Sequence, residues 1–128
     1  MRQALEHALY IGVGGFLGAN ARYFVSLGIG AISGRNFPFG TLIINVSGSF
    51  LLAVFLAWVA KQVHFEEAVR LLVTVGFFGA YTTFSSFANE TIALFQDGNW
   101  LAGALYIVGT NALCLLGVVP GLWIGSKL

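Results

Sequence analysis

The sequence predicts an all-α membrane protein with four transmembrane helices. Hydrophobic residues make up 58% of the 128 residues and charged residues only 9%, with a mean hydropathy of +0.87. Soluble domains carry about 25% charged residues, so this composition cannot cover a surface that faces water. The apolar residues also fall into four runs, each near or above the ~20 residues that cross a bilayer core as a helix. At this length we expect a single four-span transmembrane domain, residues 1–128.

The four expected spans are separated by short polar links. They cover residues 8–32, 37–60, 68–95 and 100–123. Arg22 interrupts the first span, and the second contains no charged residue. The third holds Arg70 near its start and Glu90 near its end. The three tryptophans of the chain lie near span ends, as expected of residues at a membrane interface.

The first apolar run has a second interpretation. Arg2, the apolar residues 8–17 and the small residues 19–21 are similar to a secretory leader with its cleavage site. The apolar pattern resumes after Arg22 with YFVSLGIGAI, which a cleaved leader would not explain. We therefore favour a transmembrane helix.

The distribution of basic residues gives only a weak orientation signal. An even number of spans places both termini on one side, together with Arg2, Lys61, Arg70 and Lys127. The opposite links contain only Arg35. This bias predicts cytoplasmic termini, but the difference is small.

Polar residues inside the spans form three stripes at helical spacing. The stripes are Thr41, Asn45 and Ser49; Thr83, Phe87 and Glu90, with Ser86 beside them; and Tyr106, Thr110 and Cys114. Small and hydroxyl residues often serve only to pack membrane helices, as the GxxxG pair Gly14 and Gly18 is expected to do. Three stripes in one small bundle favour a hydrated path instead.

Arg22 and Glu90 lie inside or near the ends of spans, where an ionisable side chain is costly. The cost is ~2.5–3.5 kcal/mol on insertion scales, so such a residue usually faces a partner or water. The two side chains could neutralise each other as a structural pair. Alternatively, Arg22 lies in a wet vestibule and attracts anions, while Glu90 lies at the membrane interface.

The third span contains the segment GFFGAYTTFSSFANE, residues 76–90, which predicts a helix break near its middle. Gly76, Gly79 and the pair Thr82 and Thr83 all have low helix propensity. A broken helix is tolerated at membrane depth only where its backbone is buried in protein or lines a cavity. The carbonyl groups of residues 79–82 are therefore candidate ligands for a small hard cation.

Phe84 and Phe87 follow the break at i, i+3, on one face of the helix. An aromatic ring has a positive edge, so two ring edges could line the path of an anion. Packing against neighbouring helices is the alternative interpretation.

Three segments resemble the signatures of the Fluc/CrcB family of fluoride channels. They are GGFLGANARY (residues 14–23), GTLIINVSGSF (residues 40–50) and GFFGAYTTFSSF (residues 76–87), in family order and one per span. The resemblance implies a passive fluoride channel of the bacterial inner membrane that exports fluoride from the cytoplasm. It also implies an antiparallel, dual-topology homodimer with two pores and a central structural sodium ion.

The resemblance assigns roles to residues of this chain. Phe84 and Phe87 match a phenylalanine pair whose ring edges line the pore, and Asn45 matches an asparagine that donates to the anion. Gly79 and Thr82 match positions whose backbone carbonyls bind sodium. Further matches near the pore are Ser86, Thr41, Tyr106 and Glu90, with Thr110 on the same stripe as Tyr106 and Arg22 in the vestibule.

Four positions depart from the family pattern. Ala80 stands where a glycine is common, Tyr81 is bulkier than expected, and Thr110 and Cys114 replace more usual serines. We expect these changes to affect the conduction rate more than the identity of the protein.

Other classes of protein fit the sequence less well. A small multidrug or cation antiporter also has four spans and dual topology, but it depends on a carboxylate in the first span, where this chain has Arg22. A structural membrane subunit would explain the glycines but not the polar stripes. An enzyme is disfavoured because the sequence shows no nucleophile–base pair, metal-ligand cluster or phosphate loop. The net charge of +1 gives no surface for nucleic acid.

Overall fold

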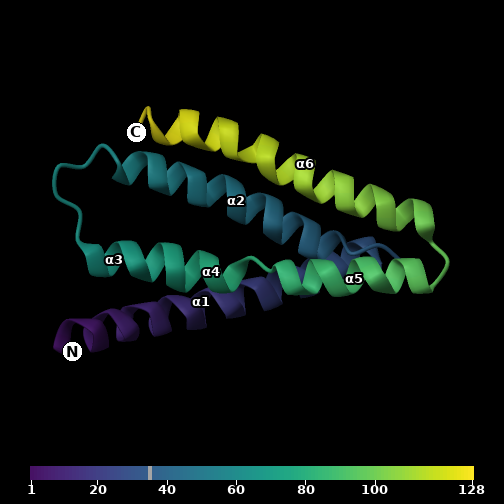
Figure 1. The fold of residues 1–128 in the computed structure, drawn as a ribbon, viewed down its shortest axis with the longest axis horizontal. Helices are drawn as coiled ribbons and strands as arrows, with labels where there is room; N and C mark the ends of the chain where they lie inside the picture. The colour runs from purple at the N-terminus through teal and green to yellow at the C-terminus, as the bar shows by residue number, and fades with distance from the viewer. Residues whose placement is uncertain (35) are drawn as a thin grey trace.

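The computed structural model describes residues 1–34 and 36–128, which form helices and no strand. In chain order these are α1 (Arg2–Ser33), α2 (Phe39–Val59), α3 (Glu67–Leu71), the π-helix η1 (Leu72–Phe78), α4 (Gly79–Tyr81), α5 (Phe84–Gln96) and α6 (Trp100–Gly125). The helices run side by side along one long axis, and both termini lie at the same end as the link between α2 and α3 (Figure 1).

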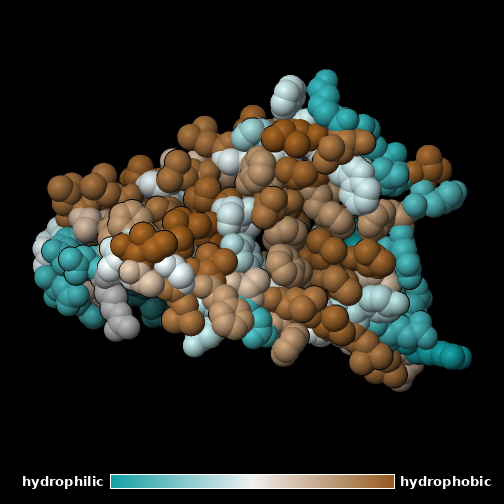
Figure 2. All heavy atoms as spheres, turned by 180° about the vertical axis from the view of Figure 1, so that it is seen from behind, coloured by the Kyte–Doolittle hydropathy of each residue, from teal (hydrophilic) through white to brown (hydrophobic). Residues whose placement is uncertain are grey.

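Three helical units are long and apolar enough to cross a membrane. They are α2, the continuous row Glu67–Gln96 and α6. The longest helix, α1, is not among them, because Asn20, Arg22 and several glycines dilute its apolar residues. The span expected over residues 8–32 is thus helical, but its place in the membrane stays a prediction. The face seen in Figure 2 carries a broad apolar band, with hydrophilic side chains gathered toward the two ends.

The third expected span is interrupted within the segment where the sequence predicts a break. Thr82 (φ −80°, ψ 157°) and Thr83 (φ −153°, ψ 113°) are extended and separate α4 from α5. The Thr83 side chain then caps α5 by accepting a 3.2 Å hydrogen bond from the backbone N–H of Ser86. The preceding turns, η1, have the wider π geometry, which the sequence did not predict.

Close helix packing depends on glycines, which have no Cβ atom. Gly14 and Gly18 lie against the backbone of η1, where an added Cβ would overlap the carbonyl oxygens of Leu72 and Phe77. The expected GxxxG contact is therefore present, between α1 and η1. Gly121 and Gly125 give α6 the same close approach to the backbone of α2.

Two further glycines reverse the chain at the end opposite the termini. Gly34 (φ 73°) ends α1 and Gly98 (φ 78°) lies between α5 and α6, in a backbone region that other residues rarely adopt. Arg35, the only basic residue expected in these links, lies outside the described residues.

Candidate anion pathway

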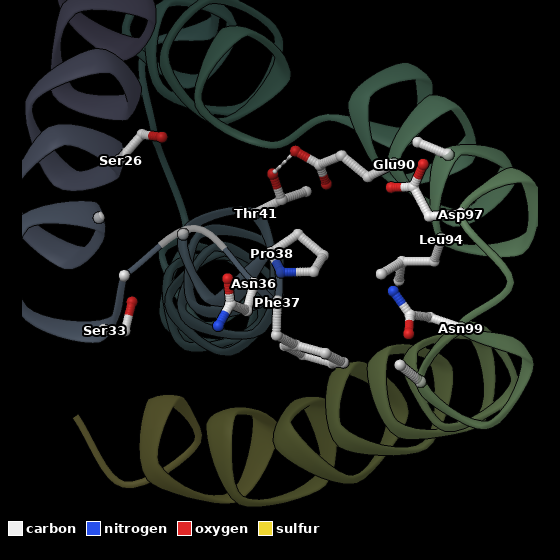
Figure 3. A pocket seen from close by; sticks show the side chains of 15 residues that line it. Ser26, Ser33, Asn36, Phe37, Pro38, Thr41, Glu90, Leu94, Asp97 and Asn99 are labelled. Atoms are coloured by element: carbon white, nitrogen blue, oxygen red, sulfur yellow. Dashed lines mark hydrogen bonds between the residues drawn. The ribbon is translucent and has the colours of Figure 1, made fainter.

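Three pockets follow one another along α2. The loop pocket, about 750 Å³, lies among α1, α2, α5 and the start of α6, and its lining includes Ser26, Thr41, Glu90, Asp97 and Asn99 (Figure 3). The central pocket, about 280 Å³, is lined by Arg22, Ser26, Thr41, Thr83, Ser86 and Glu90, among others. The break pocket, about 330 Å³, is lined by Asn45, Ser49, Thr82, Thr83, Phe84, Phe87, Thr110 and Cys114, among others. The loop and central pockets share Ser26, Thr41 and Glu90, and the central and break pockets share Thr83.

Asn45 is joined to the helix break by two hydrogen bonds. Its amide nitrogen donates to the Thr83 carbonyl oxygen at 3.0 Å, and its amide oxygen accepts from the Thr83 N–H at 2.8 Å. Thr83 is only 8% exposed, so these bonds satisfy backbone groups that the break removes from the helix. The Asn45 amide carries two hydrogens, so one N–H remains for a ligand in the break pocket.

Glu90 accepts hydrogen bonds on both carboxylate oxygens. The Thr41 hydroxyl donates to Oε1 at 2.8 Å (dashed in Figure 3), and the Tyr106 hydroxyl donates to Oε2 at 2.7 Å. Hydrogen bonds to a charged acceptor are shorter and stronger than neutral ones. One member of each polar stripe thus meets at the carboxylate of Glu90, which lines both the loop pocket and the central pocket.

The two phenylalanines of the break pocket have different surroundings. Phe87 is 7% exposed and packs on Tyr106 with ring centroids 5.1 Å apart. Phe84 is 76% exposed on the single chain, although its ring lies 5.5 Å from that of Phe87. Phe84 thus lies on the surface of the single chain, beside the break pocket.

Thr110 has an unused hydroxyl in the break pocket. The residue is 5% exposed, and its Oγ1 has no hydrogen-bond partner among residues 1–34 and 36–128. A buried hydroxyl without a partner is costly. Since Thr110 faces the break pocket with Asn45, a ligand in that pocket would offer it a partner.

Arg22 and Glu90 line the central pocket but do not form a pair. Across the part of the chain that the structure describes, ion pairs join Arg2 to Glu6 and Arg70 to Glu67, and none joins Arg22 to Glu90. The two side chains thus form no direct ion pair within the described chain. The remaining interpretation is that Arg22 faces a wet cavity.

The break also leaves carbonyl oxygens without backbone donors. Within the described chain, no backbone N–H donates to the carbonyl oxygens of residues 79–82, because the Thr83 N–H is directed at Asn45 instead. Gly79 is exposed on the single chain. His, Cys, Asp and Glu form no group of three suited to a metal within residues 1–34 and 36–128.

Comparison with known proteins gives the family. The family model described as CrcB-like protein, Camphor Resistance (CrcB), matches residues 9–122. The chain belongs to the CrcB family. A protein of Koribacter versatilis is 46% identical over 116 residues, which cover 91% of this chain and 92% of the relative. A protein of Shewanella oneidensis is 43% identical over 117 residues, which cover 91% and 94%.

A third relative is a longer protein. The Methylococcus capsulatus protein is 46% identical over 118 residues, which cover 92% of this chain but 50% of the relative. All three relatives carry the name fluoride-specific ion channel FluC. CrcB membership confirms the resemblance carried by the three segments, and it supports a channel rather than an antiporter or an enzyme.

Sequence reasoning missed two features of this CrcB chain. Ser26, Asp97 and Asn99 line the loop pocket, but Asp97 and Asn99 lie in an expected link, Ser26 lies inside the first expected span, and none of them belongs to the three stripes. The contact between Ser47 and Tyr81 was also missed, because it joins two helices across positions with no shared periodicity. The polar character of the expected links was the only available signal for the first feature.

Proposed function

We propose that this CrcB protein is a passive channel for fluoride. The observation that carries the proposal is the line of three adjoining pockets, where the polar stripes of α2, α5 and α6 meet. The names of the relatives supply the ion. Export from the cytoplasm of a bacterium, across its inner membrane, follows as part of the same proposal.

Fluoride is small and strongly hydrated, so a narrow path must replace its water with other donors. The break pocket offers the unpartnered Thr110 hydroxyl, the second N–H of Asn45 and the hydroxyl of Ser86 nearby. The positive ring edges of Phe84 and Phe87 would add weak attraction. Weak attraction suits conduction, since an ion that is held too tightly cannot leave.

The channel proposal is tested by fluoride release from liposomes that contain the purified protein. With equal pH on both sides and no nucleotide, fluoride should leave down its own gradient, as followed by a fluoride electrode. A strict requirement for a proton gradient would favour the antiporter, and a requirement for ATP would favour a pump. Either result would overturn the proposal.

We infer that the working form is a homodimer of antiparallel, dual-topology subunits, with two pores and with α1 as a fourth span. The support is the exposed ring of Phe84 and the exposed Gly79 at the break, which a second copy could cover. A single cysteine placed in the α2–α3 link, in a Cys114→Ser background, tests the orientation. Labelling from one side of the membrane should reach half the molecules, and labelling of all molecules from one side would contradict it.

A structural sodium ion at the subunit contact completes the proposal. The carbonyl groups of Gly79 and Thr82 fit a hard cation because, within the described chain, no backbone N–H donates to them. One chain offers few oxygens, so equivalent carbonyls of a second copy would complete the site. When bound, the ion would supply positive charge that neutralises these carbonyl dipoles. Replacing sodium with a large organic cation should lower the stability of the dimer, and unchanged stability would count against the site.

A further inference from the structure

Tyr81 is the last residue of α4, directly before the extended residues of the helix break. Its side chain is 8% exposed, and its hydroxyl lies 3.0 Å from the Ser47 hydroxyl on α2. Neither residue belongs to the polar stripes or to the proposed ligands of the sodium ion. Tyr81 is also a position where this chain carries a larger side chain than its family resemblance predicts.

The direction of this hydrogen bond follows from the neighbouring one. Ser47 donates its only proton to the Ile44 carbonyl oxygen, at 3.2 Å. Tyr81 is therefore the donor, and Ser47 accepts. The hydroxyl group that distinguishes tyrosine from phenylalanine thus has a defined partner on a different helix.

The Tyr81 ring packs against Phe77 and against α2. It stacks on Phe77 at a centroid distance of 5.8 Å and an interplanar angle of 12°. On the side of α2, a Cβ atom added to Gly48 would come within 3.2 Å of the ring and would overlap the Thr82 methyl group. The absence of a side chain at Gly48 lets the break approach α2 closely.

The residues on either side of Thr82 are therefore both hydrogen-bonded to α2. Tyr81 bonds to Ser47, and Thr83 bonds to Asn45. The carbonyl groups of residues 79–82, which lack backbone donors within the described chain, lie within or next to this hydrogen-bonded segment. Their direction depends on the backbone of Tyr81 and Thr82.

We propose that Tyr81 is a positioning residue, whose hydrogen bond to Ser47 aims the break carbonyls at a cation. The proposal rests on the sodium site proposed above. Tyr81 does not touch the ion, since only backbone oxygens are assigned to it. Loss of the Tyr81 hydroxyl should leave the fold intact and lower the affinity for sodium.

The experiment measures how much sodium restores fluoride efflux after its removal. Wild-type protein, Tyr81→Phe, Ser47→Ala and the double variant are reconstituted into liposomes in an organic cation and titrated with sodium. Each single variant should raise the half-saturating sodium concentration about fivefold, which corresponds to about 1 kcal/mol for one hydrogen bond. The double variant should show the same shift as each single variant, because both remove the same bond. Tyr10→Phe removes an exposed hydroxyl on α1 and serves as the control. It should leave the half-saturating sodium concentration unchanged.

The possible outcomes separate the two proposals. If wild-type efflux does not depend on sodium, the cation site is wrong and the role of Tyr81 is wrong with it. If wild-type efflux depends on sodium but both single variants keep the wild-type half-saturation, the cation site stands and Tyr81 has no positioning role. A merely structural role would lower the yield of folded protein or the maximal efflux without moving the half-saturating concentration. Additive shifts in the double variant would likewise show that the bond is not the cause.

Discussion

Replacing Asn45 with alanine should destabilise the protein strongly, because the side chain satisfies two backbone groups at the helix break. Its amide donates to the Thr83 carbonyl and accepts from the Thr83 N–H, at 3.0 Å and 2.8 Å. Thr83 is buried, and both of its backbone groups lose their protein partner when the amide is removed. Each buried group left without a partner costs about 1–3 kcal/mol. The two together should lower the free energy of unfolding by roughly 2–6 kcal/mol.

Unfolding by sodium dodecyl sulfate, followed by tryptophan fluorescence, measures this change. Asn20→Ala is the matched control, since the Asn20 amide is exposed and bonds only to the Phe16 carbonyl of its own helix. We expect the control to change stability by less than about 0.5 kcal/mol, as is usual for surface sites. If Asn45→Ala unfolds no more easily than Asn20→Ala, the break does not depend on Asn45 and the reasoning is wrong.

Three further predictions test the pathway and the packing around it. Phe87→Ile keeps an apolar side chain but removes the ring edge, so fluoride efflux should collapse while the protein still purifies as a folded species. A similar loss is expected for Phe84→Ile. Normal efflux in both variants would show that the two rings serve only for packing. Gly18→Val should cost about 1–3 kcal/mol of stability through overpacking against η1. Gly12→Val should be tolerated in the same unfolding assay, because no atom lies within 4 Å of an added Cβ. Equal destabilisation by the two substitutions would contradict the close packing of Gly18 on η1. Glu90→Gln keeps the shape but removes the charge that accepts two hydroxyl donors, so efflux should fall at least tenfold, and wild-type efflux would remove Glu90 from the pathway.

Much of the fold was predictable, because membrane spans leave a strong signal in composition. The apolar run of α2, the row Glu67–Gln96 and α6 agree with the expected spans to within a few residues. The break was predictable for a local reason, since glycine and threonine weaken a helix at residues 79–83. The π-helical turns of η1 were not predictable, because they depend on the fit of this segment against the glycines of α1.

The candidate pathway was predictable as a set of residues but not as a set of contacts. Helical spacing placed Thr41, Glu90 and Tyr106 on three separate stripes, and only the folded chain brings them together in one cluster. Asn45 was expected to face an anion, and the structure adds its two bonds to Thr83. Such contacts depend on the rotation and depth of each helix, which periodicity does not specify.

The most direct test of the account compares fluoride and chloride efflux from the same liposomes, with the wild-type protein and with Phe87→Ile. A potassium ionophore lets potassium leave together with the anion, so that no membrane potential opposes efflux, and ion-selective electrodes follow both anions. The account predicts fast fluoride release and little chloride release by the wild-type protein, and loss of fluoride release in the variant. Equal release of both anions by the wild-type protein, or no release of fluoride, would contradict the claim that this pathway conducts fluoride selectively.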